Sequence, residues 1–187
     1  SDNGEKSTFS EFKDKITELQ SSGMSKMIID LRDNPGGVLD EACNMADMIL
    51  PEGIITYTET KSGKRTDYNS DAESLDIPIV ILINENSASA SEVFTGALKD
   101  YGKATVVGKK SYGKGIVQSV LPFYDGSGMS LTVAKYYTPN GTCIHGIGIE
   151  PDVEVDMPDE YKDMYASMVE HDKDTQLQKA IEIIKEK

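Results

Sequence analysis

The spacing of apolar residues along the chain predicts alternating helices and strands. Apolar side chains recur at helical spacing, with one buried face, in the segments 9–19, 38–50 and the second half of 84–100, and a further helix is expected at 174–184. Short apolar or alternating runs predict strands at 26–32, 54–60, 63–68, 78–84, 105–108, 116–124 and 129–137. Strand 26–32 is expected to be buried on both faces, as parallel strands are.

The order of these elements predicts an α/β fold with a mixed sheet, flanking helices and a late antiparallel strand pair. The chain has 187 residues, of which 38% are hydrophobic, and this is enough for one domain with a real core. We therefore expect a single domain over residues 1–187, with a loose polar start at 1–8.

Charge and cysteine content narrow the possible partners. The formal net charge is −13, which argues against nucleic acid and anionic membrane surfaces as partners. The two cysteines, Cys43 and Cys143, imply no disulfide framework, although a single bridge is compatible with the sequence. No signal peptide and no apolar run of about 18 residues is visible.

Candidate chemistry begins with a cluster of serines at the start of a predicted helix, in Asn84–Asp100 (NENSASASEVFTGALKD). Unpaired N–H groups and the helix dipole favour developing negative charge there, as a serine nucleophile requires. The same letters also fit a capping box, because Ser89 and Glu92 have the S-x-x-E spacing. Capping serines are commoner than catalytic ones, so this pattern alone favours a cap.

A lysine flanked by glycines, Gly113-Lys114-Gly115, follows with Gln118 four residues later. A lysine can activate a serine only when its amine is neutral, and burial favours that neutral form. No acidic residue lies within four positions of Lys114. A glutamine can accept a hydrogen bond from the amine without adding a negative charge. These residue types suggest a Ser/Lys hydrolase.

Four motifs, in this order, resemble those of the carboxy-terminal-processing, or tail-specific, serine peptidases. They are Met27–Gly37 (MIIDLRDNPGG), Ser87–Glu92 (SASASE), Tyr112–Gly115 with Gln118, and Gly148–Asp152 (GIEPD). The resemblance implies that Ser89 is the nucleophile, Lys114 the general base and Gln118 the residue that orients the lysine amine.

Further expectations come from the same resemblance. It implies a ClpP/crotonase-like layered fold, an extracytoplasmic location in the bacterial periplasm or cell envelope, and protein or peptide substrates with apolar carboxyl-terminal tails. Members of this family usually carry a PDZ domain, which is not visible here. We expect the full-length form to carry a PDZ domain and a membrane anchor.

The oxyanion hole is expected to combine two backbone N–H groups. Ala90, which follows the nucleophile, supplies one by the usual geometry of a strand-to-helix turn. The other lies in the Asn34–Gly37 turn, where glycine lets the backbone approach a ligand. Gly36 and Gly37 are both candidates, and the resemblance implies the same loop. Taken in isolation, Pro-Gly-Gly is also a common tight turn.

Other functions fit the sequence less well. Ser111 to Lys114 matches S-x-x-K, but the flanking glycines disfavour the helix that this motif opens in penicillin-binding proteins. His145 and His171 are expected on the surface, which disfavours a Ser-His-Asp triad. Metal and redox cofactors have no motif to support them, so none is expected. Two alternatives stay open: a silent peptide-binding or scaffold module of this fold, and a crotonase-like acyl-CoA enzyme.

Overall fold

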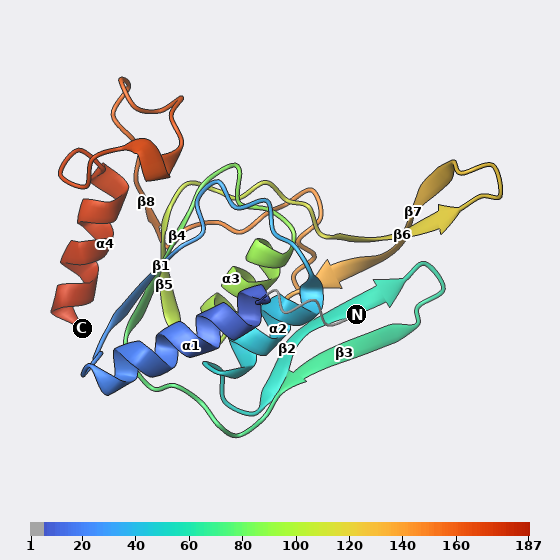
Figure 1. Ribbon diagram of the computed structural model, residues 1–187, viewed down its shortest axis with the longest axis horizontal. Coiled ribbons are helices and arrows are strands. Elements are labelled where there is room, and N and C mark those ends of the chain that lie inside the picture. The colour runs from blue at the N-terminus through green and yellow to red at the C-terminus, as the bar shows by residue number, and fades with distance from the viewer. Residues whose placement is uncertain (1–5) are drawn as a thin grey trace.

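The computed structural model describes residues 6–187, which form two sheets with helices packed around them (Figure 1). In chain order the elements are α1 (Thr8–Ser21), β1 (Met27–Asp30), α2 (Leu39–Asp47), β2 (Gly53–Thr60), β3 (Arg65–Ser70), β4 (Ile79–Ile83), α3 (Ala90–Asp100), β5 (Ala104–Gly108), β6 (Ile116–Pro122), β7 (Gly128–Tyr137), β8 (Val153–Glu154), a 3-10 turn (Ala166–Met168) and α4 (Thr175–Glu186).

The first sheet is parallel, with strand order β1-β4-β5-β8. All five residues of β4 are buried, because helices cover both faces of the sheet. Ile79, Ile81 and Ile83 pack with α2 and α3, whereas Val80 and Leu82 pack with α4. A strand between two helix layers has no solvent-facing position, which explains the continuous apolar run of β4.

Strand β1 lies at the edge of this sheet and is less buried than its sequence predicted. Met27 is buried, Ile28 and Ile29 are half-buried, and Asp30 is exposed. The expectation of burial on both faces was therefore wrong for this strand. An edge strand has a neighbour on one side only, so solvent reaches part of it.

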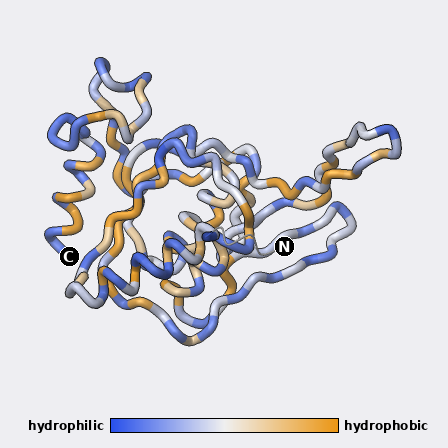
Figure 2. Tube along the Cα trace, viewed as in Figure 1, coloured by the Kyte–Doolittle hydropathy of each residue, from blue (hydrophilic) through white to orange (hydrophobic). Residues whose placement is uncertain are grey.

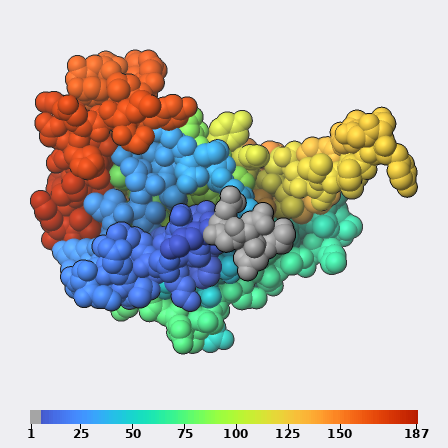
Figure 3. Space-filling view, in the orientation of Figure 1, coloured from blue at the N-terminus to red at the C-terminus, as the bar shows by residue number. Residues whose placement is uncertain are grey.

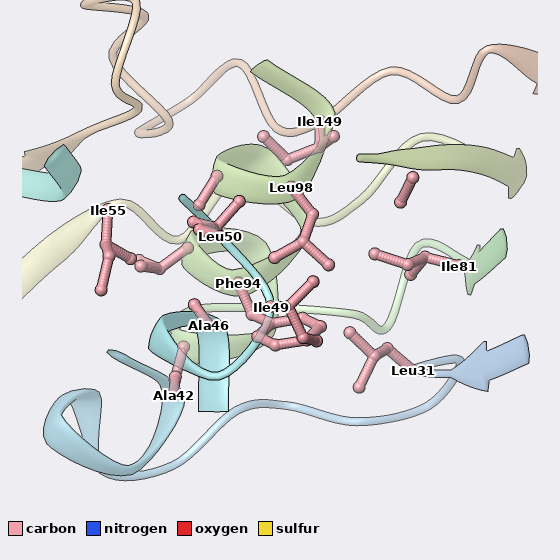
Figure 4. Close-up of a cluster of buried hydrophobic side chains, with 14 of the residues drawn as sticks. Leu31, Ala42, Ala46, Ile49, Leu50, Ile55, Ile81, Phe94, Leu98 and Ile149 are labelled. Carbon is pink, nitrogen blue, oxygen red and sulfur yellow. The ribbon is translucent and has the colours of Figure 1, made fainter. Parts of the chain in front are cut away.

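The main core lies between the parallel sheet and the helices α2 and α3 (Figure 4). Ala46 and Ile49 on the α2 side meet Phe94 and Leu98 of α3, and Ile81 closes the cluster from the sheet. These side chains match the apolar positions that predicted the two helices. The start of α3 is thereby held rigidly at the carboxyl end of β4.

The second sheet is antiparallel, with strand order β3-β2-β7-β6. Residues Ala134 to Tyr137, at the end of β7, pair with β2, whereas the part of β7 before Ala134 pairs only with β6. The distal part of this hairpin therefore projects from the body of the molecule (Figure 3). Apolar residues are concentrated in the parallel sheet and continue along β6 and β7 (Figure 2).

The predicted α/β layered class is confirmed, and all four helices and the predicted strands are present within a few residues of the expected bounds. The pattern did not reveal that the strands divide between two sheets, nor the two-residue strand β8. Of the loose start expected at 1–8, residues 1–5 lie outside the described part, while Ser7 caps α1 and Thr8 begins it. No helix among residues 6–187 is long and apolar enough to cross a membrane.

Both cysteines are free thiols, in agreement with the expected lack of a disulfide framework, but they differ in environment. Burial, followed by the nearby charge of Asp40, raises the pKa of the Cys43 thiol to about 12, from an ordinary value of 9.0. Cys143 is only half-buried. Because a thiolate is the reactive species, the two residues are expected to differ sharply in reactivity.

We predict that iodoacetamide at mildly alkaline pH modifies Cys143 in the folded protein and Cys43 only after denaturation. Peptide mass spectrometry measures both rates, and equal modification of the two thiols in native protein would contradict the packing around Cys43. The fold favours the neutral Cys43 thiol, so its contribution to stability is complete below pH 9 and is lost as the pH rises towards 12.

Candidate active site

Ser89 occupies a tight turn between β4 and α3, where its backbone has φ 57° and ψ −119°. A positive φ is uncommon for a residue other than glycine and costs roughly 1–3 kcal/mol, so the surrounding structure must enforce it. A strained strand-to-helix turn of this kind presents the side chain of its central residue, as in the nucleophile elbow of α/β-hydrolases. Ser89 is half-buried at the start of α3.

The glutamate of the predicted capping box is in place. The Ser89 N–H donates to Oε2 of Glu92 at 2.8 Å, and the Glu92 N–H donates to the Ser89 carbonyl oxygen at 2.9 Å. Glu92 therefore provides hydrogen-bond partners for both the N–H and the carbonyl group of Ser89. Capping and a catalytic role for the Ser89 hydroxyl are compatible, because the contacts of this cap involve the serine's backbone.

Lys114 reaches the same carboxylate from a distant part of the chain. Its backbone N–H also donates to Glu92 Oε2, at 2.8 Å. The backbone nitrogens of Ser89 and Lys114 thus share one acceptor atom, and they can be no farther apart than two hydrogen bonds of 2.8 Å laid end to end. The structure brings together the two residues that the sequence predicted as nucleophile and base.

The glycines beside Lys114 allow this close approach. A Cβ on Gly115 would lie 2.3 Å from the backbone nitrogen of His145, and Gly113 has a φ of 89°. The Gly113 carbonyl accepts a hydrogen bond from the Gly146 N–H at 2.9 Å. The loop between β5 and β6 (residues 109–115, the lysine loop) therefore packs closely against the segment 144–149, with no space for a side chain at Gly115.

The side chains of Lys114 and Gln118 are both exposed, Gln118 near the base of the projecting β6–β7 hairpin. Within residues 6–187, no hydrogen bond joins the side chains of Ser89, Lys114 and Gln118. The burial that would keep the lysine amine neutral is not provided by the described residues. The fold also places an acidic residue, Glu92, against the Lys114 backbone, which the local sequence did not reveal.

The Pro-Gly-Gly turn lies directly against the serine. A Cβ on Gly36 would be 2.4 Å from the Ala88 carbonyl oxygen, 2.6 Å from the Ala90 nitrogen and 3.0 Å from Ser89 Cβ, and its φ is 84°. Gly37 is different, since a Cβ there would meet no atom of the described residues within 4 Å. The Gly36 N–H already donates to Oδ1 of Asn34 at 2.9 Å. The two glycines therefore differ both in steric room and in the use of their N–H groups.

Asp33 holds this turn in place, a role that the sequence did not suggest. Its carboxylate accepts hydrogen bonds from Asn84, Asn86 and the Ala166 N–H, at 2.8, 2.9 and 2.8 Å. Partial burial alone would raise the pKa of Asp33, but these three hydrogen bonds and the charge of Arg32 lower it. The Asp33 carboxylate thus connects the start of the Asn34–Gly37 turn to the segment before Ser89 and to the carboxyl-terminal region.

Arg32 anchors the same region from inside the protein. Its buried guanidinium contacts Asp30 at 2.6 Å and Asp174, the cap of α4, at 2.7 Å. Burial opposes the charge, but the hydrogen bonds to these two carboxylates outweigh it and raise the pKa of Arg32. Since breaking a buried pair leaves an uncompensated charge, this cluster strongly favours the observed position of α4.

A cavity of about 140 Å³ adjoins the turn. Gly36, Gly37 and Ala90 line it together with four apolar side chains from the residue after β1, from α2 and from α3, namely Leu31, Ala42, Met45 and Phe94. A small apolar cavity beside a serine and free backbone N–H groups can receive one apolar side chain of a bound peptide.

Comparison with known proteins agrees with this geometry. Residues 3–155 match the model of peptidase family S41. A "Probable CtpA-like serine protease" of Staphylococcus aureus is 49% identical over 156 residues, covering 81% of this chain and 31% of that protein. The corresponding protein of Staphylococcus epidermidis is 46% identical, covering 81% of this chain and 32% of its own length. The match thus spans about a third of the length of these relatives.

Among solved structures, the photosystem II D1 C-terminal processing protease superimposes with a TM-score of 0.75 and 38% identity, over 81% of this chain and 40% of that one. The resemblance drawn from the sequence motifs is therefore confirmed at the level of the whole fold. On the match of residues 3–155 and the identity to these relatives, the chain belongs to peptidase family S41.

Proposed function

We propose that this domain catalyses peptide-bond hydrolysis with Ser89 as nucleophile and Lys114 as general base. The observation that carries the proposal is the sharing of Glu92 Oε2 by the backbone N–H groups of Ser89 and Lys114. This contact joins two loops 25 residues apart in the sequence. Family membership and the strained turn at Ser89 support the same assignment.

The reaction would proceed through an acyl-enzyme. The neutral amine of Lys114 takes the proton of the Ser89 hydroxyl as Oγ bonds to the scissile carbonyl carbon. The tetrahedral intermediate then collapses, the C–N bond breaks, and the lysine ammonium returns the proton to the leaving amine. Water, deprotonated by the same lysine, attacks the ester carbonyl carbon. The C–Oγ bond then breaks, the lysine ammonium returns its proton to Ser89 Oγ, and the carboxyl product is released. Gln118 is proposed to orient the amine.

The oxyanion hole is assigned to the N–H groups of Ala90 and Gly37. Ala90 is the first residue of α3, so its N–H has no acceptor within the helix. Of the two loop glycines, Gly37 is preferred because the Gly36 N–H is already engaged by Asn34. Gly36 then acts by permitting the close contact between the turn and Ala90. Donors aimed at the developing oxyanion are usually the largest electrostatic contribution to such reactions.

The substrates are proposed to be proteins or peptides with apolar carboxyl-terminal tails. The cavity beside Ala90 is lined by apolar side chains and is small, so it would accept a compact apolar residue next to the scissile bond. Cleavage near the carboxyl terminus follows the name of the solved relative, a C-terminal processing protease. An extracytoplasmic location is consistent with the CtpA-like relatives.

Exposure of Lys114 has a consequence for activation. An exposed ammonium is strongly hydrated, so removal of that water makes the amine a more effective base. We propose that a bound substrate, lying across Ser89 and the base of the β6–β7 hairpin, covers Lys114. A module that binds peptides without cleaving them is the second candidate, and the exposed lysine is the observation that favours it.

Labelling with a fluorophosphonate probe tests the proposed function. In the full-length protein we expect one adduct, located at Ser89 by peptide mass spectrometry, with a rate that rises with pH. The Lys114→Ala variant should lose both the rate and its pH dependence. Absence of any adduct across the pH range would contradict the proposal and support the binding module.

A further inference from the structure

Glu92 is almost completely buried, with 1% of its surface exposed, although it carries a carboxylate. The side chain accepts four hydrogen bonds and has no cationic partner among residues 6–187. Burying a carboxylate is costly unless its oxygens are fully hydrogen-bonded. Four donors fill its acceptor capacity, so the site is built around this one group.

The four donors come from two separate segments. Oε2 accepts the N–H groups of Ser89 and Lys114, both at 2.8 Å. Oε1 accepts the Gly113 N–H at 2.7 Å and the Ser111 hydroxyl at 2.5 Å. A helix cap requires only the Ser89 contact, so the other three serve a different purpose. They fasten the lysine loop to the start of α3.

Ser111 extends the hydrogen-bond network of Glu92 to a third segment of the chain. Its buried hydroxyl accepts the Ile149 N–H at 2.7 Å while donating to Glu92. The Ser111 N–H donates to the Ile149 carbonyl oxygen at 3.1 Å. The lysine loop is therefore held on one side by Glu92 and on the other by the segment 144–149. In this arrangement Lys114 has a fixed backbone and a free side chain.

We propose that Glu92 is a positioning residue that sets the distance between nucleophile and base by holding the backbones of Ser89 and Lys114 on one oxygen atom. The inference rests on the proposed function of these two residues. Because the donors to Glu92 are neutral, the carboxylate fixes the lysine loop without an ion pair to the lysine amine. A direct ion pair would instead favour the charged, inactive form of the base.

The Glu92→Gln variant is a sharp test, because glutamine has the same size and shape as glutamate but replaces one of its two acceptor oxygens with an NH₂ donor. Each carboxylate oxygen accepts at least one backbone N–H, which cannot reverse its direction. Either orientation of the glutamine amide therefore points an NH₂ group at a backbone N–H. We expect the lysine loop to shift and turnover to fall by about 10²-fold, the typical cost of misplacing a catalytic group by about an ångström.

Three measurements on the full-length protein distinguish a positioning role of Glu92 from a general effect on stability. All three are made well below the melting temperature of each variant. The loss should appear in kcat with little change in KM. Hydrogen exchange should accelerate at the Gly113 and Lys114 amides but not in β4. The probe reactivity of Glu92→Gln/Lys114→Ala should be close to that of Lys114→Ala alone, since Glu92 acts through the placement of the lysine.

Ser111→Ala is the matched variant, since it removes one donor to Glu92 and leaves the three backbone N–H donors in place. We expect a smaller loss of kcat than with Glu92→Gln. Folded Glu92→Gln protein with wild-type kcat and a wild-type labelling rate would overturn the inference. Wild-type protein that shows no Lys114-dependent labelling would instead contradict the proposed function, so the two failures are distinguishable.

Discussion

Replacing either Ser89 or Lys114 with alanine is expected to reduce peptide cleavage by the full-length protein on the order of 10⁴ to 10⁶-fold, since the members of such a catalytic unit fail together. Each residue is needed in the same step, in which the hydroxyl loses its proton as it attacks. The double variant should consequently be no slower than either single variant. Steady-state kinetics on a peptide with an apolar carboxyl-terminal tail measures all three rates.

Lys110→Ala provides the matched control. Lys110 is four residues from Lys114 and forms an ion pair with Glu150 at 2.6 Å on the surface. Its removal should leave turnover within a few-fold of wild type, because exposed ion pairs contribute little. Circular dichroism should show that all variants retain the fold. Wild-type cleavage by a folded Ser89→Ala protein would refute the assignment of the nucleophile.

The second large effect is expected from Gly36→Ala. The added Cβ would lie 2.4 Å from the Ala88 carbonyl oxygen and 2.6 Å from the Ala90 nitrogen, both of which are backbone atoms. These atoms cannot rotate away, so the turn must separate from the start of α3. We expect the oxyanion hole to open and kcat to fall by about 10² to 10³-fold, the usual cost of losing one donor.

Gly37→Ala is the control for the steric part of this prediction, because a Cβ at Gly37 meets no atom of residues 6–187 within 4 Å. Its melting temperature should match that of the wild type. Gly36→Ala should in addition be less stable by roughly 1–2 kcal/mol, because φ is 84° at that position. Thermal denaturation of both variants tests this contrast in stability, and kinetics of Gly36→Ala tests the loss of kcat. A wild-type kcat in folded Gly36→Ala protein would contradict the assigned role of Gly36.

Much of the fold follows from local pattern. Burial of apolar side chains sets the helical spacing in α1, α2 and α3 and the continuous apolar run of β4. This periodicity can be read directly from the sequence. The two-residue strand β8 escaped prediction because it is too short for any periodicity. The division into two sheets also escaped, since strand pairing depends on contacts between distant segments.

The candidate site shows the same limit. Ser89, Lys114 and Ala90 were proposed as site residues mainly from the motifs that resemble a known family, because the local pattern at Ser89 alone favoured a helix cap. The burial expected around Lys114 was not found, because exposure depends on what the fold places over a side chain. Asp33 and Arg32 gave no local signal either, although they hold the glycine turn and α4.

The order of residues by itself determined the α/β class, the family and the identity of the candidate nucleophile and base. Only the tertiary structure distinguished Gly36 from Gly37, because two adjacent glycines differ solely in their surroundings. It alone gave Glu92 its second role. Glu92 caps Ser89 three residues away, but it reaches Lys114 only because β4, β5 and α3 bring the two loops together, and hydrogen bonds depend on distance in space.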